Sequence, residues 1–273
     1  MIMPNVETKL LELFAQKVYQ LSSDIILNNF NKVSAKEKDQ TNGDLVTFVD
    51  LEVERQIKSL ITEYFPTHKF WGEETGGEID SGYVWILDPL DGTNNYGIGL
   101  PLAGTALTLL FQNKPVFAFI SYPFVDKWYF AIENKGAYLN GTLTDKTKSL
   151  EPTKKISGLI GYEVTKNKEK YLNWLNARNQ IQINCKRVFE TWAPIIDFYL
   201  LFENKIDTII AYENEFFDLL CGALIAKEMG FKNLTFQGSE FEFSEKLEPV
   251  VSMVITCDTI LSDSVNEATK SLN

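Results

Sequence analysis

VWILDPLDGTNNYGIGLP, residues 84–101, joins an apolar run to two closely spaced aspartates. The run 84–87 is typical of a buried strand, because it is short, continuous and apolar. Asp88 ends the run, and Asp91 follows in an Asp-Gly pair, which is typical of a turn. Side chains three residues apart across such a turn can converge, so we expect Asp88 and Asp91 to lie close together.

Two more acidic positions flank this stretch at a distance along the chain. WGEETGG, upstream, offers Glu73, and EFFDLLCGALIAKEMG, downstream, places Asp218 where a helix is predicted to begin. Taken singly, an Asp-Gly pair is usually a turn, and an aspartate at a helix start is usually a cap. Each of these residues therefore has a structural interpretation as well as a functional one.

A meeting of all four carboxylates would require cations. At an effective dielectric constant near 20, two like charges ~4 Å apart repel by about 4 kcal/mol. A fold tolerates such a cluster when cations neutralise it. Because every candidate ligand is an oxygen, with no neighbouring histidine or cysteine, the set favours a hard ion, Mg²⁺ before Zn²⁺.

The composition of the chain limits the kinds of protein that it can be. A length of 273 residues with 45% hydrophobic content predicts a large core, in one domain or two tightly fused halves. A net charge of -11 predicts that neither nucleic acid nor a membrane is a partner. Three separated cysteines (Cys185, Cys221 and Cys257) predict reduced, buried thiols and, with no signal peptide, a cytoplasmic protein. The single histidine, His68, is expected to be a solvated turn residue.

The first half of the chain mixes helices with antiparallel strands. Apolar residues at spacings of three and four predict helices at 10–25 and 53–64. A polar loop at 31–44 separates them and is interpreted either as a solvated connection or as a lid. Apolar runs joined by short turns predict strands at 83–87, 104–111, 116–122 and 128–133.

The second half alternates strands with helices. The expected order is strand 156–162, helix 168–177, strand 181–185, helix 194–202, strand 206–211, helix 219–229, strands near 234 and 251, and helix 259–272. We therefore expect an α/β (α+β) layered fold in one compact unit. Its halves are 1–145, which carries most of the acidic residues, and 146–273, which carries Asp218 and the substrate-reading loops.

The acidic motifs resemble the signatures of a known enzyme family. GEET, WILDPLDGTNNY, GAYLNG and FFDLLCGALIAKEMG are similar to four motifs of the inositol monophosphatase family, and DLVTFVDLEVE resembles a fifth, upstream segment. The resemblance runs from about residue 44 to 230, with one departure, because the family's Trp-Asp is Phe217-Asp218 here. It implies an αβαβα sandwich of the inositol monophosphatase / fructose-1,6-bisphosphatase type. It also implies a Mg²⁺-dependent, lithium-sensitive phosphatase that forms a homodimer.

The resemblance implies a metal role for each acidic residue. Glu73, Asp88 and the carbonyl of Leu90 would hold one Mg²⁺. Asp88 would bridge to a second ion, shared with Asp91 and Asp218. A third ion would depend on Glu73, so each site would hold two to three ions.

The resemblance also implies which residues would activate the attacking water and which would bind the phosphate group. Asp50 and Thr93 would orient and deprotonate the attacking water. The amides of Gly92 and Thr93 would bind phosphate oxygens beside Asp91, at the start of a helix. The loop that carries Lys32, Lys36 and Lys38 would cover the site.

The substrate-reading positions depart from the family pattern. Relatives have a Gly-Ser-Ala-Ala-Leu-Asp segment where this chain has residues 192–197, so Trp192 either crowds the substrate or packs in the core. The family's hydroxyl-binding glutamate, seven residues before the last aspartate, is Ala211 here. Glu213 and Glu215 lie close by in the sequence, and we expect Glu213 to take over substrate binding.

The function inferred from these patterns is hydrolysis of a small phosphorylated alcohol, resembling inositol monophosphate, by metal-activated water. Histidinol phosphate, fructose 1,6-bisphosphate and adenosine 3′,5′-bisphosphate are alternative substrates. An alternative of another class is a regulatory protein that binds metal and sugar phosphate, with incidental hydrolysis. The presence of Asp50 and Thr93 favours the enzyme, because a protein that only binds needs no water-activating pair.

Overall fold

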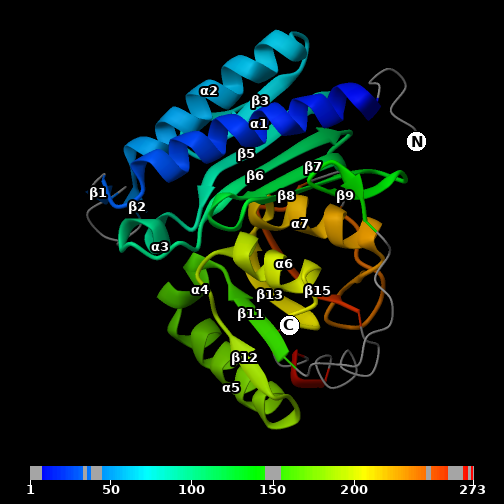
Figure 1. Ribbon diagram of the computed structural model, residues 1–273. Helices are drawn as coiled ribbons and strands as arrows, with labels where there is room; N and C mark the ends of the chain where they lie inside the picture. Colours follow the sequence, from blue (N-terminus) through cyan, green and yellow to red (C-terminus); the bar gives the residue numbers. More distant parts are fainter. Residues whose placement is uncertain are drawn as a thin grey trace.

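Five layers of helices and sheets alternate through the molecule (Figure 1). The computed structural model describes residues 8–32, 36–37, 45–144, 155–243, 247–257, 267–269 and 272, with the backbone alone for 36–37, 45–46 and 162. In order, the layers are two outer helices, a large mixed sheet, two central helices, a smaller mixed sheet and an outer helical layer. The expected αβαβα sandwich is therefore confirmed.

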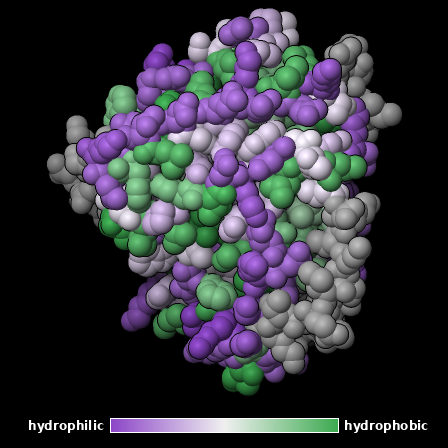
Figure 2. All heavy atoms as spheres, viewed as in Figure 1, coloured by the Kyte–Doolittle hydropathy of each residue, from purple (hydrophilic) through white to green (hydrophobic). Residues whose placement is uncertain are grey.

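The first outer layer consists of α1 (Thr8–Asn29) and α2 (Phe48–Tyr64). Each helix buries one apolar side against the large sheet, as spacings of three and four residues require. Hydrophilic side chains follow the outward side of α1 (Figure 2). At the start of α2, Thr47 and Asp50 form a reciprocal capping box, which satisfies amide groups that a helix start leaves free.

The large sheet has eight strands in the order β10-β9-β8-β7-β6-β5-β3-β4. All neighbouring pairs are antiparallel except β3 with β5, which are parallel. The strands are β3 (Lys69–Gly72), β4 (Gly76–Gly77), β5 (Tyr83–Asp91), β6 (Gly104–Phe111), β7 (Lys114–Tyr122), β8 (Lys127–Ile132), β9 (Gly136–Leu139) and β10 (Thr142–Leu143). Its central strands are buried on both faces, which explains their continuous apolar runs.

The central layer consists of α6 (Pro194–Phe202) and α7 (Phe216–Met229). Residues on every side of α7 from Leu219 to Ala226 are buried, because the helix lies between the two sheets. Gly230 ends α7 in the left-handed conformation, as the sequence predicts.

The smaller sheet has the order β12-β11-β13-β15-β14. β11 lies parallel to both β12 and β13, and the other pairs are antiparallel. The strands are β11 (Lys155–Ile160), β12 (Arg187–Phe189), β13 (Thr208–Glu215), β14 (Lys232–Leu234) and β15 (Val250–Thr256). The last layer contains α4 (Tyr162–Lys166) and α5 (Lys168–Asn184).

The expected strand at 181–185 is wrong, because α5 continues to Asn184. Trp174, Ala177 and Ile181 are buried at helical spacings of three and four, so the apolar face of the helix extends through this segment. The strand that pairs with β11 comes later, as β12. A short local alternation was therefore mistaken for a strand.

The remaining short elements are β1 (Lys36–Glu37), β2 (Leu45–Val46), α3 (Thr93–Gly97) and the 3₁₀ turn η1 (Pro123–Val125). β1 and β2 pair antiparallel. The side chains of Lys36 and Lys38, and most of the helix expected at 259–272, lie outside the described residues. Among the residues that are described, every helix is too short or too polar to span a bilayer.

The three cysteines differ in exposure. None of the three forms a disulfide with another described residue. Cys221 is buried, Cys185 is half-buried and Cys257 is exposed. The expectation of three buried thiols is wrong for Cys257, which follows the last residue of β15 at the edge of the core.

His68 is part of an aromatic cluster and is not the solvated turn residue that was expected. Its ring stacks on Phe65 and Tyr83, with centroids 5.0 Å and 4.6 Å away. Its Nδ1 accepts a hydrogen bond of 3.1 Å from Nε1 of the buried Trp85. Partial burial lowers the pKa of His68 below its ordinary value.

We predict that acid destabilises the fold through His68. The unfolded chain takes up this proton at a higher pH than the folded chain, so the contribution is complete above about pH 6.5 and is lost as pH falls through the lowered pKa. Urea unfolding at pH 7.5 and pH 5 should show a smaller loss of stability for His68→Gln than for the natural protein. The single imidazole can be titrated by NMR, and a pKa at or above 6.5 would contradict the prediction.

Candidate active site

A β-bulge explains how one strand presents two aspartates together. Asp88 of β5 pairs with Ala106 of β6, and Asp91 pairs with Gly104, so three steps along β5 match two along β6. In a regular strand, residues three apart point to opposite faces. The extra residue restores the two carboxylates to one side. Pro89 is tolerated here because a bulge does not need its missing N–H.

Glu73 reaches the same place from the neighbouring strand of the large sheet, and Asp218 reaches it from the central layer. Glu73 follows β3, and its amide donates to the carbonyl of Leu87 in β5 at 3.0 Å. Asp218 lies in the first turn of α7, where Glu215 occupies the cap position. A pocket of about 200 Å³, called the acidic pocket below, is lined by Glu73, Asp88, Leu90, Asp91, Gly92, Thr93, Asn94, Trp192, Glu215, Phe217 and Asp218. The four predicted carboxylates therefore surround one cavity.

The carboxylates of the acidic pocket disfavour one another's charged forms. Burial, followed by the negative charges of Glu73, Asp91 and Asp218, raises the pKa of Asp88 well above its ordinary value. Burial also raises the pKa of Asp91 well above its ordinary value. Both residues expose about 6% of their surface, so solvent screens the repulsion poorly.

Backbone amides hold the two aspartates in place. Asp88 Oδ1 accepts from the amide of Leu90 at 3.0 Å, and Asp91 Oδ2 accepts from the amide of Ile195 at 2.7 Å. The second bond joins the large sheet to the start of α6 in the central layer. Asp91 is therefore positioned by residues from both halves of the chain.

The donor set fits a hard divalent cation. Within the described residues, no group of three or more histidine, cysteine, aspartate or glutamate side chains is already arranged around a single point as metal ligands. The acidic pocket nevertheless has carboxylate and carbonyl oxygens on its walls and contains neither histidine nor cysteine among its lining residues. Oxygen ligands with this charge are those that Mg²⁺ prefers. Glu73, Asp88, Asp91, Asp218 and the Leu90 carbonyl could hold it.

The structure brings Asp50 and Thr93 into direct contact. Thr93 Oγ1 lies 2.7 Å from Asp50 Oδ1 and 2.8 Å from the carbonyl oxygen of Leu90, either of which can accept its hydrogen. Asp50 is buried, which raises its pKa, and its other oxygen accepts from the amide of Thr47 at 2.8 Å. The capping box of α2 thus holds the aspartate that contacts the edge of the acidic pocket.

Gly92 allows the chain to turn from β5 into α3. Its φ of +93° is in the left-handed region, and an added Cβ would lie 2.5 Å from the carbonyl oxygen of Leu102. Another residue would therefore be strained and would collide with the backbone. The turn places Thr93 at the first position of α3.

A larger cavity continues from the acidic pocket. This side chamber, of about 370 Å³, is lined by Asn94, Gly158, Leu159, Ile160, Gly161, Thr165, Glu190, Trp192, Ala193, Pro194, Asn214, Glu215 and Asp218. The two cavities share four residues, and the chamber lies at the carboxyl ends of the parallel strands β11 and β12. Such strand ends are where open α/β sheets bind ligands.

Trp192 stands at the junction of the two cavities, so the interpretation as a core residue is wrong. It exposes 71% of its surface and lines both cavities. Its φ of +57° lies in the left-handed region, which is unusual for a tryptophan. The bulky indole replaces the small residue of the family pattern at the rim of the site.

Glu213 does not line either cavity. Its two carboxylate oxygens accept from Lys170 Nζ of α5 at 2.8 Å and 2.6 Å. Ala211, the position of the family glutamate, is fully buried. Glu215, two residues after Glu213, lines both the acidic pocket and the side chamber. Of the two glutamates that the sequence offered, the structure therefore places Glu215 at the cavities and Glu213 in an ion pair with Lys170.

A buried network that the sequence did not reveal fixes the Trp192 loop. Asn95 Nδ2 donates to the carbonyl of Thr191 at 2.9 Å. The hydroxyl groups of Thr191 and Ser157 both donate to the carboxylate of Asp197. Asp197 is fully buried, and burial raises its pKa to about 7. Asp197, the one charged residue in the apolar run 194–202, was the available signal.

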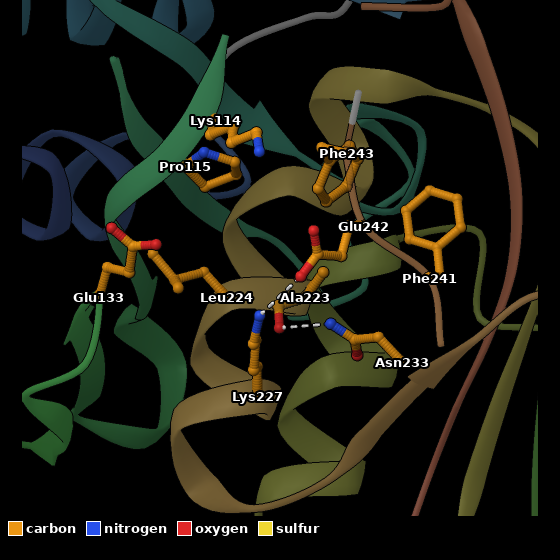
Figure 3. A pocket seen from close by; sticks show the side chains of 10 residues that line it. All are labelled: Lys114, Pro115, Glu133, Ala223, Leu224, Lys227, Asn233, Phe241, Glu242 and Phe243. Atoms are coloured by element: carbon orange, nitrogen blue, oxygen red, sulfur yellow. Dashed lines mark hydrogen bonds and ion pairs between the residues drawn. The ribbon is translucent and has the colours of Figure 1, made fainter. Parts of the chain in front are cut away.

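A separate cavity of about 120 Å³ lies toward the other end of α7 (Figure 3). Its wall includes Lys227, 3.8 Å from Glu242, and Asn233, whose Nδ2 donates to the carbonyl of Ala223 at 3.0 Å. Phe241 and Phe243 add aromatic surface. With two lysines and two glutamates on its wall, this remote cavity lacks the acidic cluster of the candidate active site.

Known proteins share both the sequence pattern and the fold. The inositol monophosphatase family matches residues 9–269. A fructose-1,6-bisphosphatase/inositol-1-monophosphatase of Aquifex aeolicus is 31% identical over 209 residues, covering 76% of this chain and 78% of the relative. The Nus factor SuhB of Vibrio cholerae is 29% identical over 212 residues, covering 75% and 76%.

A solved structure gives the same picture at the level of the fold. The crystal structure of an IMPase/NADP phosphatase complexed with Mg²⁺ and phosphate superposes with a TM-score of 0.76 at 20% identity. The superposition covers 94% of this chain and 93% of that one.

We predict that Asp197→Asn removes a pH-dependent cost of folding. A carboxyl group whose pKa rises from its ordinary value to about 7 on folding loses stability as pH increases from about 4 to 7. The variant should therefore gain stability relative to the natural protein between pH 5 and pH 8, by on the order of 2 kcal/mol. Urea unfolding at both pH values measures this gain. An equal difference between the two proteins at both values would contradict it.

Proposed function

Because the chain belongs to the inositol monophosphatase family, we propose that it hydrolyses a small phosphorylated alcohol in a Mg²⁺-dependent reaction. The members of this family are phosphatases, so the protein is a phosphoric monoester hydrolase. The observation that carries the proposal is the convergence of Glu73, Asp88, Asp91 and Asp218 on one cavity beside the Asp50–Thr93 pair.

The acidic residues would hold the metal ions. Glu73, Asp88 and the Leu90 carbonyl would bind one ion, and Asp88, Asp91 and Asp218 a second, with Glu73 available to a third. Bound Mg²⁺ would neutralise these charges, make water a stronger nucleophile and stabilise the leaving oxygen. The related IMPase/NADP phosphatase, whose crystal structure is a complex with Mg²⁺ and phosphate, supports this assignment.

Asp50 and Thr93 would accept the proton of the attacking water. The Thr93 hydroxyl can take a proton from water while it passes its own to Asp50 Oδ1, 2.7 Å away. Burial raises the pKa of Asp50, which makes its carboxylate a better base. The amides of Gly92 and Thr93, beside Asp91, would bind oxygens of the phosphate group. Trp192 would border the alcohol part of the substrate.

Inositol monophosphate is the first candidate substrate. The names of several relatives support it, and the name of the Aquifex relative also supports fructose 1,6-bisphosphate. Histidinol phosphate and adenosine 3′,5′-bisphosphate are the other two candidate substrates. Phosphate release from these four compounds in Mg²⁺ would rank them.

A regulatory protein with incidental hydrolysis is the second candidate function. The similarity to a Nus factor SuhB favours it. The direct contact between Asp50 and Thr93 favours the enzyme, because binding alone does not require a proton acceptor at this position.

We also propose a cytoplasmic homodimer, in which each chain is divided into halves 1–145 and 146–273. The cysteines are separated in the sequence and form no disulfide in the described part of the chain, which supports a reducing compartment. The division falls between the last strand of the large sheet and the first strand of the smaller one.

We predict that Asp91→Asn and Thr93→Ala each lower kcat by at least about a hundredfold. This is the typical scale when a group that acts on the transition state is removed. Asp80→Asn, a change to an exposed aspartate that pairs with Lys69, is the matched control and should keep its activity. Retained turnover in both site variants would overturn the mechanism.

We predict that EDTA abolishes phosphate release, that Mg²⁺ restores it, and that millimolar Li⁺ inhibits it. A carboxylate cluster cannot bind an anionic phosphate until cations reverse its charge. Phosphate release with each addition measures the three effects. Full activity in EDTA would exclude the metal-dependent reaction, and insensitivity to Li⁺ would place the protein outside the lithium-sensitive branch.

A further inference from the structure

The side chamber contains a buried hydrogen-bond acceptor with no partner among the described residues. Asn214 exposes 3% of its surface and lines the chamber, and its Oδ1 has no hydrogen-bond donor within reach in the described part of the chain. Leaving a buried acceptor unpaired costs about 1–3 kcal/mol. An unpaired buried acceptor in a native structure therefore calls for an explanation, such as a role in binding a ligand.

A second β-bulge fixes the position of Asn214. Ala211 of β13 pairs with Met253 of β15, and Asn214 pairs with Val251, so β13 has one extra residue between them. The extra residue gives Glu213 a φ of +49°. As in β5, the bulge changes which side chains face the site.

The bulge is held from two sides. Lys170 binds the carboxylate of Glu213, and the Glu213 amide donates to Ser252 Oγ at 2.9 Å. The amide of Gly161, at the end of β11, donates to the carbonyl of Tyr212 at 3.0 Å. Asn214 therefore faces the chamber from a rigid support, as a recognition residue requires.

The charge of the chamber restricts what can enter it. Among its described lining residues there are three acidic side chains (Glu190, Glu215 and Asp218) and neither lysine nor arginine. Glu190 is paired with Arg178 at 2.8 Å, and Asp218 would be a ligand of the metal ion in the acidic pocket. Beyond that ion, a second phosphate group in the chamber would meet Glu215 and no lysine or arginine among the described lining residues. O–H or N–H groups, in contrast, would find acceptors there.

We propose that Asn214 is a specificity-determining residue that accepts a hydrogen bond from the alcohol part of a substrate with one phosphate group. This inference rests on the proposed function. The substrate class is a monophosphate ester whose alcohol carries O–H or N–H donors remote from the phosphate. The chamber selects against bisphosphates. Asn214 would thus bind the alcohol part of the substrate, the role that the sequence analysis expected for Glu213.

The test compares esters with and without such donors. Inositol 1-phosphate supplies O–H donors, histidinol phosphate supplies N–H donors, and p-nitrophenyl phosphate supplies neither. Asn214→Leu, of similar size, should lower kcat/KM about tenfold for the first or second ester, the effect of one hydrogen bond. It should change kcat/KM for p-nitrophenyl phosphate by less than about twofold. Which donor ester is affected identifies the donor.

Controls separate recognition from folding. Asn214→Asp keeps the acceptor and should restore most of the activity on the donor esters. Asn233→Leu is the matched control, because Asn233 Oδ1 is also buried without a partner in the described residues, but lines the remote cavity of Figure 3. If Asn214→Leu does not fold, Asn214→Ala takes its place. The melting temperature of each variant reports its folding.

Three results would each contradict a different part of the proposal: the role of Asn214, the selection against bisphosphates, or the proposed function. Equal losses on donor and donor-free esters, or no loss on either, would overturn the role of Asn214. Fructose 1,6-bisphosphate turned over as fast as the best monophosphate would overturn the selection by charge. Failure of the natural protein to hydrolyse any ester with Mg²⁺ would overturn the proposed function itself.

Discussion

One extra residue in β5 is the constraint on which the site depends. Without the bulge between Asp88 and Asp91, the sheet would place these carboxylates on opposite faces, one against the outer helices. With it, both face the central layer, where Asp218 lies in the first turn of α7 and Ile195 lies in the first turn of α6. The site is thus assembled by the packing of one sheet against two helix starts.

This arrangement carries a cost in stability. Asp88, Asp91 and Asp197 are buried, and burial raises the pKa of each, so each carboxylate opposes folding near neutral pH. Backbone amides and hydroxyl groups offset part of this cost, and cations bound by the acidic pocket would offset more. Strain at a functional site, here also visible in the φ of Trp192, is supported by rigid surroundings.

Most of the sequence-based picture holds because local patterns dominate it. The helix 194–202 and the strand 104–111 coincide with α6 and β6, and the acidic motifs meet as their chemistry requires. The sequence-based predictions fail where strand register or tertiary contacts determine the position of a side chain. The bulge in β13 could not be read from residues 211–215, so Glu213 was chosen, although it pairs with Lys170. The contacts of His68 with Tyr83 and Trp85 likewise come from residues more distant in the sequence.

The burial of α7 between the two sheets has a consequence for how the chain folds during synthesis. The strands of the large sheet are complete by Leu143, but the helix that covers their inner face begins at Phe216. For roughly fifty residues of translation, from Leu143 to the start of α6 at Pro194, the apolar inner face has no native cover, and its cover is completed only by α7. Because contacts this distant in sequence form late and leave intermediates prone to aggregation, we expect the nascent chain to be most prone to aggregation before α7 emerges.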